Sequence, residues 1–220
     1  MHLDRLNRYL RGGTPPGGLR AHPGCRDPRP PIRSAPVTLP GVLYFATESA
    51  VWTGGRAFLD TGVPEVDTGV PGVPGVPGVD TGASGAPGAP GVAFAHAHLL
   101  TAGQFADIAA QEMGREPGVD LDLSRVLGAG RDRLGPGRYE TLVLAGWRDG
   151  FPLLTFTAPW RRRDVPGNAP SAAYLRHLGA GLIAAHGWDA ARAAAYLASR
   201  PGAAGHWSAA SVETLLRGGP

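Results

Sequence analysis

Apolar residues recur at helical spacing in several parts of the chain. Near the N-terminus, Leu3, Leu6 and Leu10 predict a helix over residues 2–10 that Gly12 ends. In the middle of the chain, Phe105, Ile108 and Ala109 form an apolar stripe that predicts a helix over residues 101–114. Further helices are predicted over residues 123–128, from Pro170 to His186, from the capping residue Asp189 to Pro201, and from the capping residue Ser208 onward.

β-branched, aromatic and alternating residues predict strands between these helices. Strands are expected over residues 37–47, with a Pro-Gly interruption, and over residues 50–59 and 92–100. Residues 139–157 predict a hairpin, because Asp-Gly is a preferred tight-turn pair and here joins two apolar runs. Glycines inside a strand usually mark a bulge or a close backbone approach, so we expect one of these at Gly54-Gly55.

Residues 61–91 differ in kind from the rest of the chain. The segment contains three tandem Val-Pro-Gly units and two copies of Val-Asp-Thr-Gly, and it has no aromatic residue, Lys or Arg. Such a composition cannot bury enough apolar surface to offset the entropy of ordering it. We therefore predict one domain over residues 1–188 that is interrupted by a disordered low-complexity insertion at 61–91. Residues 189–220 are predicted to be a helical C-terminal extension.

The order of the predicted elements indicates the fold class. Strands come first, then a helix, then a hairpin, and then a series of helices, without the regular strand–helix alternation of a doubly wound sheet. We therefore predict an α+β fold with a small mixed or antiparallel sheet. We expect that sheet to be barrel-like and to be flanked by helices.

Composition narrows the class of protein. A hydrophobic share of 43% and a charged share of 18% are typical of a globular domain and not of a disordered chain. No apolar run approaches the roughly 20 residues that a membrane span needs, and residues 1–13 lack the apolar segment of a signal peptide. Cys25 is the single cysteine, so no intrachain disulfide can form. We therefore expect a cytoplasmic protein with no membrane partner.

The charge balance does not indicate a nucleic-acid partner. The basic pI near 9.5 arises from a formal net charge of only +3. All the basic side chains other than His are Arg, in a chain rich in Ala, Gly and Pro, which indicates a coding bias. We therefore expect no nucleic-acid binding surface.

Glu112 is the first candidate for chemistry. It lies seven residues after Phe105 and therefore shares the helix face that packs inward. Partial burial disfavours the charged form of a carboxylate, which suits a general acid or base. The alternative is a structural glutamate at the solvent edge, which is common near a helix C-terminus.

A pair of histidines is the second candidate. His96 and His98 alternate on a predicted strand, so both point to one face and could share a metal ion, with Asp107 or Glu112 as a third ligand. The alternative is two histidines at the surface or at the edge of the core.

Two further candidates carry weaker signals. His22, Cys25 and Asp27 lie close together in the sequence but lack a second cysteine at zinc spacing, so they indicate a metal site only weakly; Cys25 together with a distant His is an equally weak candidate for a nucleophile. The arginine triplet at 161–163 is either a solvated loop or an anion site.

Several short motifs follow one another in a particular order. They are the start Met1-His2-Leu3-Asp4, the stretch 51–57 around Trp52-Thr53-Gly54-Gly55, Gln111-Glu112-Met113-Gly114, the hairpin 139–157, Pro170-Ser171-Ala172-Ala173-Tyr174-Leu175, and His186-Gly187. This order resembles the γ-glutamylcyclotransferase-like family. Members of that family have a Tyr-Gly-Ser-Asn loop, a Trp-Gly-Gly stretch, a short helix that ends in the catalytic Glu, an Asp-Gly hairpin, and Pro-Ser-x-x-Tyr-Leu at the start of a C-terminal helix.

The resemblance implies a specific reaction. A small-molecule γ-glutamyl amine or peptide would undergo intramolecular aminolysis and release 5-oxoproline and an amine. By the resemblance, Glu112 would be the general base and Tyr174 would line the substrate pocket. The resemblance implies no metal and no other cofactor.

The Tyr-Gly-Ser-Asn loop of the family is absent from the sequence, and this leaves two alternatives. Since Met1-His2-Leu3 resembles the residues that follow that loop, the start of the protein could lie further upstream. Otherwise the domain lacks its first strand, and we would expect a catalytically impaired member that serves as a binding or regulatory module.

A third hypothesis is a metal-dependent amide hydrolase that uses His96 and His98. Chains of this kind are sometimes labelled histone deacetylases in bacterial genomes. Zinc deacetylases need an Asp-x-His pair, a further Asp and tandem histidines in a much larger fold, and His96-Ala97-His98 does not supply them.

Overall fold

The structure is a computed structural model that describes residues 3–14, 21–62 and 91–218. The predicted insertion at 61–91 therefore lies almost entirely outside the described residues. No helix within the described ranges is long and apolar enough to cross a membrane.

The helices begin and end close to where the sequence predicts. Thr101, Ser171, Asp189 and Ser208 each accept a hydrogen bond from a backbone N–H of the first turn, so four helices begin at side-chain caps. Two of these caps, Asp189 and Ser208, are confirmed predictions. The helices are α1 (Leu3–Arg11), α2 (Ala102–Glu112), α3 (Ser124–Ala129), the 3₁₀ turn η1 (Arg162–Asp164), α4 (Ala172–His186), α5 (Ala190–Ala198) and α6 (Ala209–Leu216).

The strands form three antiparallel sheets in the described part of the chain. Strand β1 pairs with β4, β2 pairs with β3, and β6 lies between β5 and β7. The predicted hairpin is confirmed as β6 and β7, joined at Asp149-Gly150. The strands are β1 (Arg33–Pro40), β2 (Val42–Glu48), β3 (Gly55–Asp60), β4 (Val92–Leu99), β5 (Arg131–Arg133), β6 (Thr141–Arg148) and β7 (Phe151–Thr157).

The structure corrects one expectation about the strands and adds a strand that was not predicted. The strand predicted over residues 50–59 begins only at Gly55, because the Ser49 hydroxyl accepts hydrogen bonds from the N–H groups of Val51 and Trp52 and folds this stretch into a turn. The strand that was not predicted is β5, which has only three residues.

The expected barrel-like closure does not occur among residues 3–14, 21–62 and 91–218. The chain leaves the β1–β4 sheet at Gly41 and enters the β2–β3 sheet. The outer edge of β2 is then occupied by loops. Phe45 donates its N–H to the carbonyl of Pro201 at 2.8 Å and accepts from the N–H of Asn168 at 3.1 Å. An edge whose backbone groups are already bonded cannot accept another strand.

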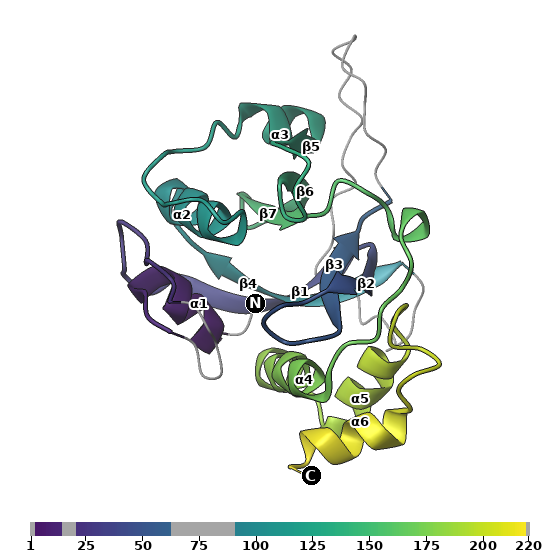
Figure 1. Ribbon diagram of the computed structural model, residues 1–220. Helices are drawn as coiled ribbons and strands as arrows, with labels where there is room; N and C mark the ends of the chain where they lie inside the picture. The colour runs from purple at the N-terminus through teal and green to yellow at the C-terminus, as the bar shows by residue number, and fades with distance from the viewer. Residues whose placement is uncertain (1–2, 15–20, 63–90, 219–220) are drawn as a thin grey trace.

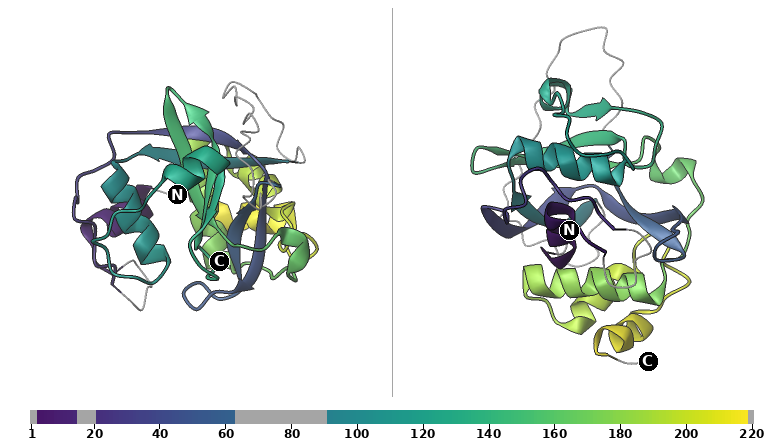
Figure 2. Two further views of the ribbon diagram at one scale, coloured as in Figure 1. Left: turned by 90° about the horizontal axis from the view of Figure 1, so that it is seen from above. Right: turned by 60° about the vertical axis from the view of Figure 1, so that its left-hand side comes forward.

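The β1–β4 and β2–β3 sheets lie in the middle of the molecule, between two groups of other elements (Figure 1). Helices α2 and α3 and the β6–β7 hairpin lie on one side, and α4, α5 and α6 lie together on the other. In the right-hand view of Figure 2, α1 lies between α2 and α4. One hydrophobic cluster joins Phe45 of β2 to buried residues of all three C-terminal helices, including Leu175, Leu197 and Val212.

The glycine pair marks a close approach of two backbone segments, as predicted. A Cβ at Gly54 would overlap the carbonyl oxygen of Ala169, and a Cβ at Gly55 would overlap that of Asn168. Gly55 donates its N–H to the Ala169 carbonyl at 2.7 Å. The glycines therefore allow the segment before α4 to lie directly against the start of β3.

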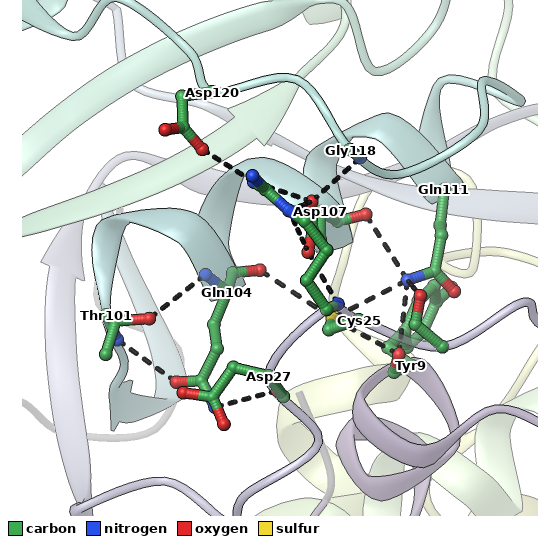
Figure 3. A network of polar contacts seen from close by, with 11 residues as sticks. Tyr9, Cys25, Asp27, Thr101, Gln104, Asp107, Gln111, Gly118 and Asp120 are labelled. Atoms are coloured by element: carbon green, nitrogen blue, oxygen red, sulfur yellow. Dashed lines mark hydrogen bonds and ion pairs between the residues drawn. The ribbon is translucent and has the colours of Figure 1, made fainter.

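A polar stripe on α2 holds the N-terminal segment in place (Figure 3). We call Gln104, Asp107 and Gln111 the α2 polar stripe; they recur at helical spacing, and the first two are almost fully buried. Gln104 donates its side-chain amide to the carbonyls of Asp27 and Arg29. Gln111 donates to the carbonyl of Tyr9 at 3.1 Å and to that of Gly24 at 3.3 Å.

Asp107 is the charged member of the α2 polar stripe, and its side chain is 1% exposed. Its carboxylate accepts from the backbone N–H of Arg26 at 2.8 Å, from the Arg26 guanidinium, and from the N–H of Gly118 at 3.1 Å. Burial alone would raise the pKa of Asp107, but these hydrogen bonds outweigh it and lower the pKa below its ordinary value. Asp107 therefore contributes stability as a carboxylate.

We expect Asp107→Asn to lower the free energy of unfolding by about 2–3 kcal/mol at neutral pH, because an amide opposes the donors that now face a carboxylate. Since the folded pKa is depressed, the contribution is present above the unfolded pKa of about 3.9 and is lost as the pH falls through the folded value. Urea unfolding at several pH values measures both effects.

Asp120→Asn is the matched control, because Asp120 also pairs with Arg26 but its side chain is 79% exposed. We expect a much smaller loss of stability from this change. Equal losses in the two variants would contradict the role given to Asp107.

Candidate functional site

Glu112 is the last residue of α2, and its side chain is held by two residues of α1. Tyr9 donates its hydroxyl to Oε1 of Glu112, and the Arg5 guanidinium donates to the same oxygen at 3.3 Å. Arg5 also donates to the Tyr9 hydroxyl at 3.1 Å. The Glu112 side chain is 10% exposed, so this carboxylate is largely withdrawn from bulk solvent. Its other oxygen, Oε2, accepts no hydrogen bond from the described residues.

The protonation states around Glu112 are fixed by burial and by charge. Burial and the Glu112 charge raise the pKa of Tyr9 well above its ordinary value, so its hydroxyl stays protonated and donates. Burial would lower the pKa of Arg5, but Glu112 and Tyr9 raise it further, so the guanidinium stays charged. Burial lowers the pKa of His22, whose ring lies 4.1 Å from that of Tyr9.

Glu112 opens onto a cavity of about 390 Å³. This volume lies within the range of roughly 300–1,000 Å³ that is typical of small-molecule sites. Besides Glu112, the wall consists mainly of the loop before β6, together with the indole of Trp160 from the loop after β7. The other lining residues are Met113, Pro136, Gly137, Arg138, Tyr139 and Glu140.

Tyr174 lies close to this site but does not line the cavity. Its side chain is buried, its hydroxyl accepts from the N–H of Ala57 at 3.4 Å, and its ring stacks on Trp52 at 5.5 Å. Burial raises the pKa of Tyr174, and the charges of Arg5 and Glu112 act on it in opposite directions. The hydroxyl therefore lies within electrostatic reach of the Glu112 carboxylate without facing the cavity.

The sequence did not point to Arg5, Tyr9 or Tyr139 as neighbours of Glu112. A signal existed in α1, because Arg5 and Tyr9 are four residues apart and share one helix face. Tyr139 carried no comparable signal, because it lies in a loop whose position is set by the sheet.

No group of three metal-binding side chains exists among the residues that the structure describes. The rings of His96 and His98 lie 4.5 Å apart, as expected for one face of a strand, and His98 shares a hydrogen bond with Ser34. The proposed third ligands are engaged elsewhere, Asp107 with Arg26 and Glu112 with Arg5 and Tyr9. The structure therefore does not bring together the ligand set suggested for a metal.

The other two candidate sites are also placed by the structure. Cys25 lies against α2, with its thiol 3.3 Å from the carbonyl of Tyr9 and 3.7 Å from the side-chain amide of Gln111. Arg161 caps η1 and the next two arginines form its first residues; Arg163 is 79% exposed and faces Asp164. Neither site borders the cavity.

No family model, curated protein or solved structure matches this chain. The assignment of a function therefore depends on the chemistry of the cavity and on the residues around it.

We expect the Cys25 thiol to react slowly with a disulfide reagent at neutral pH. Burial raises the pKa of Cys25 to about 11, so the reactive thiolate is rare. Its rate should fall on the order of 100-fold below that of a free cysteine peptide. The measurement is absorbance after addition of an aromatic disulfide, with the guanidinium-unfolded protein as control. Equal rates in the folded and unfolded protein would show that Cys25 is an exposed, reactive thiol.

Proposed function

We propose that this protein is a γ-glutamylcyclotransferase-like enzyme that converts a small γ-glutamyl amine or peptide into 5-oxoproline and a free amine. The observation that carries the proposal is Glu112, a largely buried carboxylate with one unbonded oxygen at the wall of a cavity. We also propose that the α+β fold is that of the γ-glutamylcyclotransferase-like family and that the protein is cytoplasmic.

The order of the elements supports the fold assignment. Helix α1 is followed by the Trp52-Thr53-Gly54-Gly55 turn, then by α2 with Glu112 at its end, and then by the β6–β7 hairpin. Helix α4 opens after Pro170-Ser171 with Tyr174 in its first turn. This order of elements is the same as the order of the motifs on which the resemblance to the family rests.

The proposed reaction uses Glu112 as a proton carrier. Oε2 takes a proton from the α-ammonium group of the substrate, and the resulting amine attacks the γ-carbonyl carbon to form a five-membered ring. Glu112 passes this proton to the nitrogen of the scissile amide, and the tetrahedral intermediate collapses as the original C–N bond breaks. Glu112 then takes the second surplus proton from the ring nitrogen and transfers it to the departing amine, which leaves as an ammonium ion. No net proton is gained or lost.

Arg5 and Tyr9 serve as positioning residues in this proposal. Both bond to Oε1, so they fix the orientation of the carboxylate while Oε2 remains available to the cavity. A general base must lie within hydrogen-bond reach of the proton that it removes, so fixing its rotamer is a direct contribution to rate.

We expect Glu112→Gln to lower the release of 5-oxoproline from γ-glutamyl amines by at least about 100-fold, because an amide cannot accept the proton. The measurement is 5-oxoproline release by the purified protein over a panel of γ-glutamyl amines and peptides. Glu116→Gln is the matched control, since Glu116 lies four residues further along and is exposed.

The outcomes separate the possible roles. Activity that persists in Glu112→Gln would remove Glu112 from the mechanism. A wild-type protein that binds the γ-glutamyl compounds but releases no 5-oxoproline would favour the alternative of a binding or regulatory module.

A further inference from the structure

Arg56 of β3 does not line the cavity itself but lies near two residues that do, Arg138 and Tyr139. It lies two residues before Phe58, so the two side chains share one face of the strand. The ring of Phe58 lies 5.3 Å from that of Tyr139 and 5.9 Å from that of Trp160, and both of these residues line the cavity. The shared face therefore directs Arg56 toward the same wall, next to Arg138, which is itself a lining residue.

Neither Arg56 nor Arg138 makes a hydrogen bond or an ion pair with any residue that the structure describes. The nearby carboxylates already have partners. Glu112 is bonded to Arg5 and Tyr9, and Glu140 is bonded to Arg115 and to the N–H of Gly137. Glu48 accepts from the N–H of Gly54 at 2.6 Å and from the Asn168 amide at 2.8 Å.

Two neighbouring guanidinium groups repel each other; Arg138 is exposed to solvent, and Glu48 is the carboxylate whose charge acts on Arg56 without forming an ion pair with it. Arg56 is half-buried, and burial together with the charge of Arg138 lowers the pKa of Arg56 below its ordinary value. A partly buried cation is normally paired, because its lost hydration is otherwise uncompensated. An anion bound between the two groups would supply the missing compensation.

We infer that Arg56 and Arg138 form an anion subsite of the cavity that binds a carboxylate of the ligand. Guanidinium groups match carboxylates because each can donate two parallel hydrogen bonds. The catalytic meaning of the subsite depends on the proposed function. A γ-glutamyl compound offers its own α-carboxylate, and a γ-glutamyl amino acid offers a second carboxylate in the leaving amine.

Binding of a carboxylate probe tests the subsite without requiring turnover. Glutarate carries two carboxylates but has neither the α-ammonium group nor the amide bond, and it can be titrated by calorimetry. We expect wild-type protein to bind glutarate and to be stabilised by it against heat. Arg56→Gln and Arg138→Gln should each weaken binding by about tenfold, which is the effect of losing one charge-assisted contact.

Arg163→Gln is the matched control, because Arg163 is 79% exposed and lies outside the cavity wall. We expect it to bind glutarate like the wild-type protein. Without ligand, Arg56→Gln should unfold at the same temperature as the wild-type protein or above it, because it removes an unpaired charge. This result would separate lost binding from lost folding.

Two results would overturn the inference: no glutarate binding by the wild-type protein, or unchanged binding in both cavity variants. Since the probe cannot react, these results are independent of whether 5-oxoproline is ever released. If the protein is active, comparing a γ-glutamyl alkylamine with a γ-glutamyl amino acid identifies the carboxylate. If Arg56→Gln lowers kcat/KM equally for both substrates, the subsite binds the α-carboxylate. If it lowers kcat/KM only for the γ-glutamyl amino acid, the subsite binds the carboxylate of the leaving amine.

Discussion

The α2 polar stripe of Gln104, Asp107 and Gln111 determines how residues 3–14 and 21–29 join the rest of the domain. Helix α1 and residues 12–14 bond to residues 21–29 at only a few points, such as Gly13 with His22 and Leu10 with Cys25, so other backbone groups of these residues need partners elsewhere. The stripe supplies the missing donors and acceptors to the backbone of Tyr9, Gly24 and Arg26 and to further carbonyls of residues 21–29. Buried polar groups of this kind hold a segment in one register, because any shift leaves them unpaired.

Docking of α1 against this stripe also creates the environment of Glu112. The carbonyl of Tyr9 is held by Gln111, while the hydroxyl of the same Tyr9 reaches Glu112 one residue further along α2. Arg5, one turn earlier, completes the set. The contact between α1 and α2 therefore supports both the fold and the site. A change that loosens α1 is expected to disturb the orientation of the Glu112 carboxylate as well.

Features that depend on adjacent residues could be predicted from the sequence. Features that depend on contacts between distant segments could not. The caps at Asp189 and Ser208, the Asp149-Gly150 turn and the close approach at Gly54-Gly55 each depend on a few adjacent residues. The barrel-like sheet was a wrong expectation, because the edge of β2 is occupied by loops some 120 to 160 residues later in the chain. The placement of Glu112 on an inward helix face was predictable, but its partners in α1 lie more than 100 residues away.

The position of Glu112 at the end of a helix is electrostatically unfavourable, and a neighbouring cation compensates for it. A carboxylate in the last turn of a helix faces the negative end of the helix dipole, which disfavours it. Arg5 lies against that carboxylate, so a cation from another helix compensates both charges. Among the described residues, Glu48, Glu112 and Glu140 are each bonded to other groups of the protein, whereas Arg56 and Arg138 make no hydrogen bond or ion pair. The unmatched charge in the site is therefore positive, and this determines the sign of the ligand group that the cavity favours, independently of the identity of the ligand.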